Sequence, residues 1–306
     1  MDNQHIRHSK VGRLLAASLF AFAIGTAAMA PAHAGPIVAP TPLFTANYST
    51  ASINSTGPTG WRVEQEPQIG GVGPTQTNRV QVVTGDSVPG TGPARPSGAL
   101  RAELLPYETK TGARDGDVTI TSGYAANRAE VYGRYPDNAS TTPAASWPDP
   151  VGSERWYTFA FMVPVDFQFA TDTRWADVTQ WKGFAGGTPP VAIEIKRDGL
   201  RLGGARTNAG LVPGDGNLGK LVPGQWTTLT IGLKFSPDPS VGWVDVYRDG
   251  VEVLPRTSIA TMDTVSTPTG GVQPDPTYLK QGIYRATNWK TDAVVYFGPI
   301  TVSPGP

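Results

Sequence analysis

The chain has 306 residues, among them 36 glycines, 29 prolines and no cysteine, and its 25 basic side chains equal its 25 acidic ones. A net charge of zero gives no whole-molecule attraction to nucleic acid or to an anionic surface, so a polyanionic ligand would need a local basic groove. Without cysteine, disulfides and thiol chemistry are excluded, and a hydrophobic core must hold the fold by itself.

The N-terminal residues have the pattern of a secretory signal peptide. Three basic residues within positions 1–13 precede an apolar run over residues 14–24, and the segment ends on Ala32-His33-Ala34. A basic region, a short apolar run and an A-x-A end are typical of a segment cleaved on export, and the run is too short to span a bilayer comfortably. We therefore expect residues 1–34 to be a signal peptide cleaved after about Ala34. The protein would be secreted and would have no membrane contact after cleavage.

Cleavage would also remove all three histidines of the chain, His5, His8 and His33. The secreted chain would then contain neither histidine nor cysteine. This excludes Ser-His-Asp and Cys-His nucleophilic sites, as well as zinc sites built on His or Cys. Any general base must be Tyr, Lys, Arg, Asp or Glu.

The rest of the chain favours strands over helices. We expect residues 35–45, which are rich in proline, to form a linker, followed by a single domain over residues 46–306. In that domain, apolar and polar residues alternate in short runs bounded by Gly, Pro, Asn and Asp. The clearest runs are residues 79–83, 156–163, 191–196, 226–235, 243–248 and 294–297. Many short strands with Gly/Pro turns predict one large β-sandwich.

Two Asp-Gly pairs predict tight hairpins. Asp249-Gly250 lies between two alternating runs, the strongest short-range hairpin signal, and Asp198-Gly199 repeats it. Residues 224–253 therefore predict a meander of three strands. This meander resembles the centre of concanavalin-A-like jelly rolls, where a G-x-W strand and a V-D-V-Y-x-D-G hairpin recur. We expect an all-β fold, a concanavalin-A-like β-jelly-roll sandwich of two antiparallel sheets.

Alternation assigns faces to the polar strand segments. In residues 278–285 the even-numbered side chains share one face, on which two tyrosines and a lysine flank a glycine that leaves room for a ligand: Tyr278, Lys280, Gly282 and Tyr284. Gln180 and Lys182 share a face from which Trp181 points away. Arg128, Glu130 and Tyr132 share a third face, and Arg101-Ala102-Glu103 repeats its R-A-E pattern. Taken singly, each segment also fits a solvated strand face or a weak surface ion pair.

Taken together, the segments resemble the jelly-roll polysaccharide lyases, which include alginate, glucuronan and heparin lyases. The family motifs R-x-E-[LV], Q-x-[HK] and Y-[FL]-K-x-G-x-Y stand here, in order, as Arg128-Ala129-Glu130-Val131, Gln180-Trp181-Lys182 and Tyr278-Leu279-Lys280-Gln281-Gly282-Ile283-Tyr284. Glu154-Arg155-Trp156-Tyr157 is similar to a further strand of the group. The resemblance covers most of residues 95–300. It implies an endo-acting lyase that splits a uronic-acid polymer by β-elimination.

This reaction needs a base for the C5 proton, an acid for the departing O4, and donors that neutralise the uronate carboxylate. The resemblance implies Tyr284 as the proton-transfer residue, with Gln180 and Arg128 as the motif residues suited to binding the carboxylate. Lys182 replaces the family histidine and could neutralise the carboxylate or, with a lowered pKa, act as base. Lys280 would bind substrate or depress the Tyr284 pKa. The other residues implied in substrate binding are Tyr278, Glu130, Tyr132, Arg285 and Arg101, the last also being the rival to Arg128 as motif arginine.

The missing histidine favours glucuronan as first substrate and alginate as second, with tyrosine as both base and acid. Two alternatives stay open: a non-catalytic carbohydrate-binding β-sandwich, and a glycoside hydrolase of the same architecture with two carboxylates across a cleft. No cofactor is required, although Asp115-Gly116-Asp117 and Asp245 could bind a structural Ca²⁺. We expect a monomer whose partner is an anionic polysaccharide, with no role for nucleic acid.

Overall fold

The computed structural model describes residues 42–48, 62–66, 80–104, 114–115, 118–119, 127–133, 149–170, 175–204, 212–286, 289 and 291–305. All of them belong to one compact unit, residues 39–306. The predicted signal peptide and most of the predicted linker lie outside the described residues. No helix in the described part of the chain is long and apolar enough to cross a membrane.

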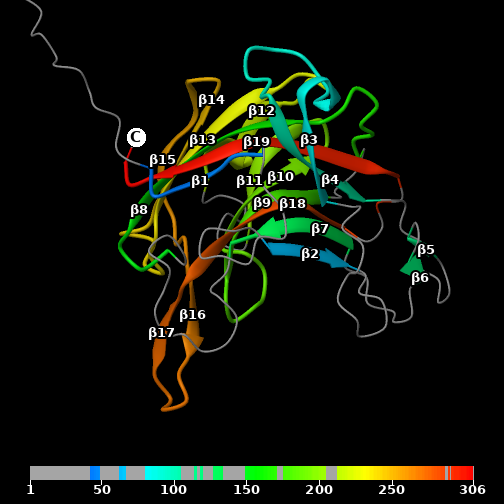
Figure 1. Ribbon diagram of the computed structural model, residues 1–306. Helices are drawn as coiled ribbons and strands as arrows, with labels where there is room; N and C mark the ends of the chain where they lie inside the picture. Colours follow the sequence, from blue (N-terminus) through cyan, green and yellow to red (C-terminus); the bar gives the residue numbers. More distant parts are fainter. Residues whose placement is uncertain are drawn as a thin grey trace, which may run out of the picture. The chain divides into compact units, whose positions relative to one another are not determined.

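Two antiparallel sheets make up most of the described structure (Figure 1). Sheet A contains β1 (Phe44–Ala46), β3 (Val80–Thr84), β4 (Gly98–Leu104), β8 (Glu154–Met162), β13 (Thr227–Lys234), β14 (Trp243–Arg248), β15 (Val251–Ser258) and β19 (Ala293–Ser303). Sheet B contains β2 (Arg62–Glu66), β7 (Asn127–Tyr132), β9 (Trp175–Gly183), β10 (Val191–Lys196), β11 (Gly199–Gly203), β12 (Asn217–Lys220) and β18 (Thr277–Arg285).

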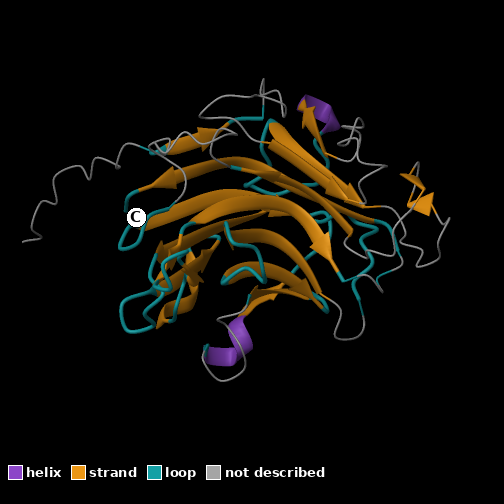
Figure 2. Cartoon of the chain, turned by 90° about the horizontal axis from the view of Figure 1, so that it is seen from below, coloured by secondary structure: helices purple, strands orange, loops and turns teal. Residues whose placement is uncertain are grey.

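The strand order is β15-β14-β13-β8-β19-β4-β3 in sheet A, with β1 paired to β19, and β12-β11-β10-β9-β18-β7-β2 in sheet B. Seen from below, the strands are curved and lie side by side (Figure 2). The smaller elements are the pairs β16 (Asp263–Ser266) with β17 (Val272–Asp275) and β5 (Arg114–Asp115) with β6 (Val118–Thr119), and two short 3₁₀ helices, η1 (Gly85–Ser87) and η2 (Pro213–Gly216). The predicted all-β sandwich of two antiparallel sheets is confirmed.

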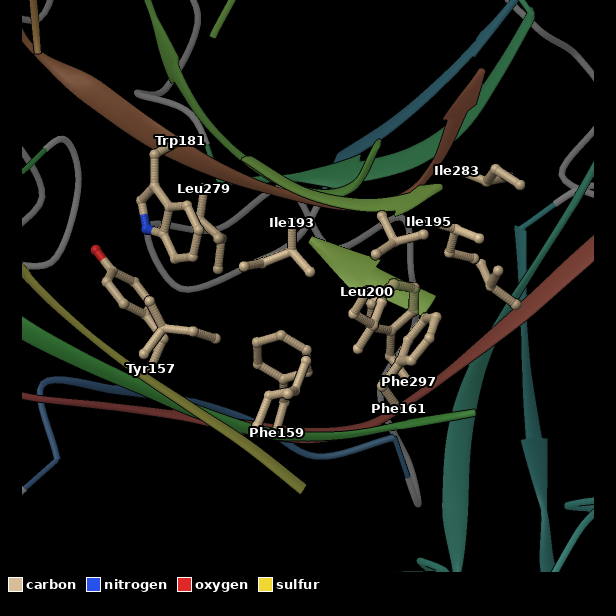
Figure 3. Packing of buried hydrophobic residues seen from close by; sticks show 14 of the residues in the cluster. Tyr157, Phe159, Phe161, Trp181, Ile193, Ile195, Leu200, Leu279, Ile283 and Phe297 are labelled. Atoms are coloured by element: carbon tan, nitrogen blue, oxygen red, sulfur yellow. The ribbon is translucent and has the colours of Figure 1, made fainter. Parts of the chain in front are cut away.

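The hydrophobic core lies between the two sheets (Figure 3). Trp181, Ile193 and Leu279 of sheet B face Tyr157 and Phe159 of sheet A, and all five side chains are buried. These residues alternate with polar ones along their strands, so each sheet turns one apolar face toward the other. The opposite face of sheet B is consequently left to polar side chains.

The predicted meander is present as β13, β14 and β15, which are consecutive neighbours in sheet A. Arg248 pairs with Val251, so Asp249 and Gly250 form the two-residue turn. Their φ angles of 51° and 78° match the turn type that favours Asn-Gly and Asp-Gly in hairpins.

The second predicted hairpin turns one residue earlier than its Asp-Gly pair suggests. Lys196 pairs with Gly199, so the turn consists of Arg197 and Asp198, and Arg197 has a φ of 56°. Gly199 already belongs to β11, where a Cβ atom would lie 2.7 Å from the carbonyl oxygen of Gly219. The glycine is therefore needed for the close approach of β12 and not for the turn.

The first strand in the described part of the chain, β1, starts inside the segment expected to be linker. Phe44 and Ala46 pair with Val302 and Ile300 of β19, and both side chains are buried. The apolar side chains of this short strand add to the core, which explains why residues 44 and 45 are strand.

One irregularity of β9 changes which side chains face outward. Thr179 pairs with Ile193 of β10, but Asp177 pairs with the next residue, Glu194, so the register shifts at Val178. Both Val178 and Thr179 are buried. This β-bulge reverses the alternation and brings Asp177 to the same face as Gln180.

Candidate active site

The three motif segments lie on adjacent strands, because β18 stands between β9 and β7 in sheet B. Tyr284 pairs with Arg128 on one side and with Asp177 on the other, while Lys280 pairs with Tyr132 and Gln180. The expected faces are therefore present on the outer side of sheet B. By contrast, the segment Glu154-Arg155-Trp156-Tyr157 belongs to β8 of sheet A.

A cavity of about 890 Å³ opens over this outer face. All four residues predicted as catalytic line it, namely Arg128, Gln180, Lys182 and Tyr284. The other charged or aromatic residues around it are Trp175, Asp177, Glu194 and Lys196. Residues from four strands thus converge on one space rich in hydrogen-bond donors.

Glu130 contacts three of the polar side chains of this site. Its side chain is buried, and its Oε1 accepts a hydrogen bond of 2.6 Å from the Gln180 amide. Its Oε2 lies 3.3 Å from Lys280 Nζ and 3.6 Å from Arg128 Nη1. A buried carboxylate with two cations and an amide donor is well compensated, and it orients the side chains around it. Glu130 and Lys280, expected to bind substrate, are buried in this network and do not line the cavity.

Tyr284 sits between a cation and an aromatic ring. The Arg128 guanidinium lies 4.4 Å from the centre of the Tyr284 ring, and Trp175 packs edge-on against it at 5.2 Å. Burial raises the pKa of Tyr284 above its ordinary value, and the positive charge of Arg128 opposes this shift without reversing it. A raised pKa keeps the Tyr284 phenol in its protonated form. Lys280 is expected to bind substrate or to depress this pKa, and in the structure its ammonium lies 3.3 Å from Glu130.

Lys182 shows the opposite shift. Burial, followed by the positive charges of Lys280 and Arg128, lowers the pKa of Lys182 from its ordinary value. A lysine with a lowered pKa exposes a neutral amine at a less alkaline pH, which is the property a lysine base needs.

Asp177 and Glu194 are the acidic residues of the cavity that sequence reasoning missed. They pair directly across β9 and β10, and burial raises the pKa of both carboxyl groups. Strict alternation from Gln180 assigns Asp177 to the core side, and only the bulge at Val178 places it in the cavity. The sequence carries no clear signal for that bulge.

Three aromatic rings form a row beside the cavity, and the middle one belongs to Tyr278, which pairs with Lys182. Tyr278 lies 6.1 Å from Tyr132 and 4.9 Å from Phe184, measured between ring centres. Among the described aromatic side chains, that of Phe184 is the most exposed. The buried carboxylate of Asp275 fixes its backbone by accepting hydrogen bonds of 3.0 Å from the amides of Phe184 and Ala185.

Two residues predicted to bind substrate lie elsewhere. Arg101 is in β4 of sheet A, where its guanidinium lies 2.8 Å from Glu103 in a partly exposed ion pair. Arg285 is buried and donates a hydrogen bond to the carbonyl oxygen of Thr291. It follows Tyr284 directly, so its side chain points to the other side of the strand.

The glycine of the third motif serves packing between strands and does not leave room for a ligand. Gly282 has a φ of 147°, and a Cβ atom there would lie 2.2 Å from the carbonyl oxygen of Ala129. The glycine thus allows β7 to approach β18 closely, which brings Arg128 beside Tyr284.

The residues considered for calcium do not assemble in the part of the chain that is described. Asp245 is buried in β14 with Arg256 Nη2 at 3.9 Å, whereas residues 116–117 lie outside the described residues. Within the described ranges, no group of three or more His, Cys, Asp or Glu side chains could hold a metal ion.

The fold and the site define an antiparallel β-sandwich protein with a cavity on one outer face, lined by both cationic and acidic side chains. The chain belongs to the polysaccharide lyase family, whose model matches residues 50–301. The prediction of a polysaccharide lyase is confirmed at the level of the family. No curated protein matches the chain in sequence.

Solved structures similar to the chain include both lyases and other proteins. The cellulose-induced protein Cip1 shares 10% identity over 85% of this chain and 97% of its own, with a TM-score of 0.46. A family 7 alginate lyase, A1-II′, shares 15% over 67% of this chain and 79% of its own, with a TM-score of 0.41. Alginate lyase vAL-1 from Chlorella virus shares 13% over 80% and 93%, with a TM-score of 0.39.

Proposed function

We propose that this protein cleaves a uronic-acid polymer by β-elimination in the cavity of sheet B. The observation that carries the proposal is the convergence of Arg128, Gln180, Lys182 and Tyr284 on one cavity. These side chains supply the carboxylate ligands, the base and the acid that the reaction needs.

Arg128 and Gln180 bind the uronate carboxylate. Both carry planar sets of N–H donors that match a carboxylate, and Glu130 holds both in place. Gln180 uses one amide hydrogen on Glu130 and keeps a second for the substrate. These donors stabilise the charge that spreads into the carboxylate once the C5 proton has left.

Lys182 and Tyr284 divide the proton transfers. The neutral amine of Lys182 takes the C5 proton, the electron pair forms the C4–C5 double bond, and the C4–O4 bond breaks. The Tyr284 phenol gives its proton to the departing O4. The lowered pKa of Lys182 and the raised pKa of Tyr284 favour this assignment over a tyrosine that performs both steps.

Glucuronan is the first candidate substrate and alginate the second, since the secreted chain would have no histidine for the pairing used by the heparin and alginate lyases. The aromatic row of Tyr132, Tyr278 and Phe184 supports an extended polymer, because sugar rings stack on accessible aromatic faces. The rings of Tyr132 and Tyr278 are partly exposed, and that of Phe184 is exposed. We further propose that the protein is exported by residues 1–34 and acts as a monomer.

To test this proposal, the secreted chain is incubated with glucuronan, alginate or heparin. The absorbance of the new C4–C5 double bond is then measured over time. We expect the signal with glucuronan first. Tyr284→Phe should abolish turnover and leave oligosaccharide binding intact, because only the transferable proton is lost. Absence of the signal on every uronan would overturn the lyase proposal, and an active Tyr284→Phe variant would overturn the role of Tyr284.

A further inference from the structure

Asp177 is a buried acidic side chain in the lining of the cavity. Only 4% of it is exposed, yet it lines the cavity together with the four residues of the proposed mechanism. It pairs with Tyr284 on one neighbouring strand and with Glu194 on the other. Among the described residues, none donates a hydrogen bond to its carboxyl group.

Every strand around Asp177 presents a titratable or charged group to it. These groups are Glu194 from β10, Tyr284 from β18, Arg128 and Glu130 from β7, and Lys182 from β9 itself. Glu194 and Glu130 disfavour a further negative charge, whereas Arg128 and Lys182 favour one. The negative charge of Glu130 is compensated by Lys280 and Arg128. The main electrostatic repulsion on an ionised Asp177 therefore comes from Glu194.

Glu194 has its own contacts on the neighbouring strand β11 and the residue after it. Its carboxyl group lies across Gly203, where a Cβ atom would be 1.9 Å from Glu194 Oε1, and the amide of Gly204 donates a hydrogen bond to it. Asp177 and Glu194 stand opposite each other on β9 and β10, and burial disfavours the charge of each, so the two carboxyl groups cannot both ionise at low cost.

We propose that Asp177 is a further catalytic residue, which stands as a neutral carboxylic acid and donates a hydrogen bond to the substrate's uronate carboxylate. The proton stays on Asp177 throughout, and no bond of Asp177 is made or broken. The hydrogen bond strengthens when Lys182 removes the C5 proton and negative charge builds on the substrate carboxylate. This inference rests on the proposed function and adds a third donor beside Arg128 and Gln180.

The expected charge state of Asp177 agrees with this role. Burial, followed by the charges of Glu194 and Glu130, raises the pKa of Asp177 well above its ordinary value. An ionised Asp177 would instead repel the uronate and offer it no donor. Activity should therefore fall as the pH rises through the Asp177 pKa.

Asparagine and alanine at position 177 separate this role from a structural one. An asparagine side chain keeps an N–H donor of similar shape and cannot ionise, whereas alanine has no donor. On glucuronan, we expect Asp177→Ala to lower kcat on the order of 10²-fold, as for the loss of one donor to a developing charge. Asp177→Asn should stay within about tenfold of wild type, and its activity should persist to higher pH. Asp166→Asn, in an exposed turn, serves as the matched control.

The outcomes distinguish this inference from the proposed function. If the wild-type chain forms no unsaturated product, the proposed function fails. If wild type is active and Asp177→Ala keeps full kcat, or Asp177→Asn is as inactive as Asp177→Ala, the inference about Asp177 alone is overturned. Should Asp177→Ala fail to fold, the isosteric Asp177→Asn still decides, through its kcat and the alkaline limb of its pH profile.

Discussion

At the scale of single residues, the buried carboxylate of Glu130 positions the cationic side chains of the site. Glu130 contacts Lys280, Arg128 and Gln180, and only the last two of these line the cavity. Lys280 is buried against Glu130. It also contributes positive charge that helps to lower the pKa of Lys182.

The role of Lys182 as base predicts a change in pH dependence for Lys182→Arg. Arginine keeps the positive charge but does not lose its proton in proteins, so the base is removed while the charge stays. We expect kcat to fall on the order of 10²-fold or more, as for the loss of a general base.

The pH dependence of activity tests the same role, because a lysine base is active only in its neutral form. Wild-type activity should rise as the pH rises through the lowered Lys182 pKa, because the neutral amine is the active form. The limb should be absent from any residual activity of Lys182→Arg. A variant that keeps the wild-type rate and acid limb would show that Lys182 only neutralises the carboxylate and that Tyr284 takes the C5 proton.

At the scale of strands, the close approach of β7 and β18 places Arg128 against Tyr284. Gly282→Ala should lose about 2 kcal/mol or more of stability, because it combines an unfavourable φ with a clash against Ala129. Urea unfolding measures the effect. Gly305→Ala, whose Cβ atom would meet no neighbour within 4 Å, is the control. Equal stability of the two variants would contradict the packing role of Gly282.

The segment after β9 gives a second prediction at this scale. Phe184→Ala removes the exposed ring of the aromatic row. It leaves intact the hydrogen bonds to the Asp275 carboxylate, because the donors are the main-chain amides of residues 184 and 185. We expect KM for the polymer to rise roughly threefold to tenfold, as for the loss of one aromatic contact, with kcat little changed. Short oligosaccharides that do not reach the row should show no change, and an equal loss on both substrates would argue against a stacking subsite.

Strand alternation predicted much at this scale, because it depends on neighbouring residues alone. It placed Gln180 and Lys182 opposite Trp181, and it placed Tyr284 opposite Ile283. It failed at Asp177, because a bulge in β9 changes which residues face outward. The bulge arises from the pairing of β9 with two neighbours, which a single segment of sequence does not encode.

At the scale of the whole molecule, the sequence left the choice between Arg101 and Arg128 open, since both stand in the same R-A-E pattern. Their strands differ only in long-range pairing: β4 joins β19 and β3 in sheet A, whereas β7 joins β18 and β2 in sheet B. Long-range pairing also explains why the role of Asp275 was not foreseen. Its carboxylate reaches the amides of Phe184 and Ala185 from a distant part of the chain.

The central claim is that the cavity of sheet B eliminates, and does not hydrolyse, a uronan. The most direct measurement is the mass and absorbance of the oligosaccharides formed from glucuronan by the secreted chain. We predict products with a C4–C5 double bond at the new non-reducing end, each lighter by one water than the corresponding hydrolysis product. Saturated oligosaccharides of the heavier mass would mean that carboxyl groups such as Asp177 and Glu194 carry out hydrolysis, and would contradict the account.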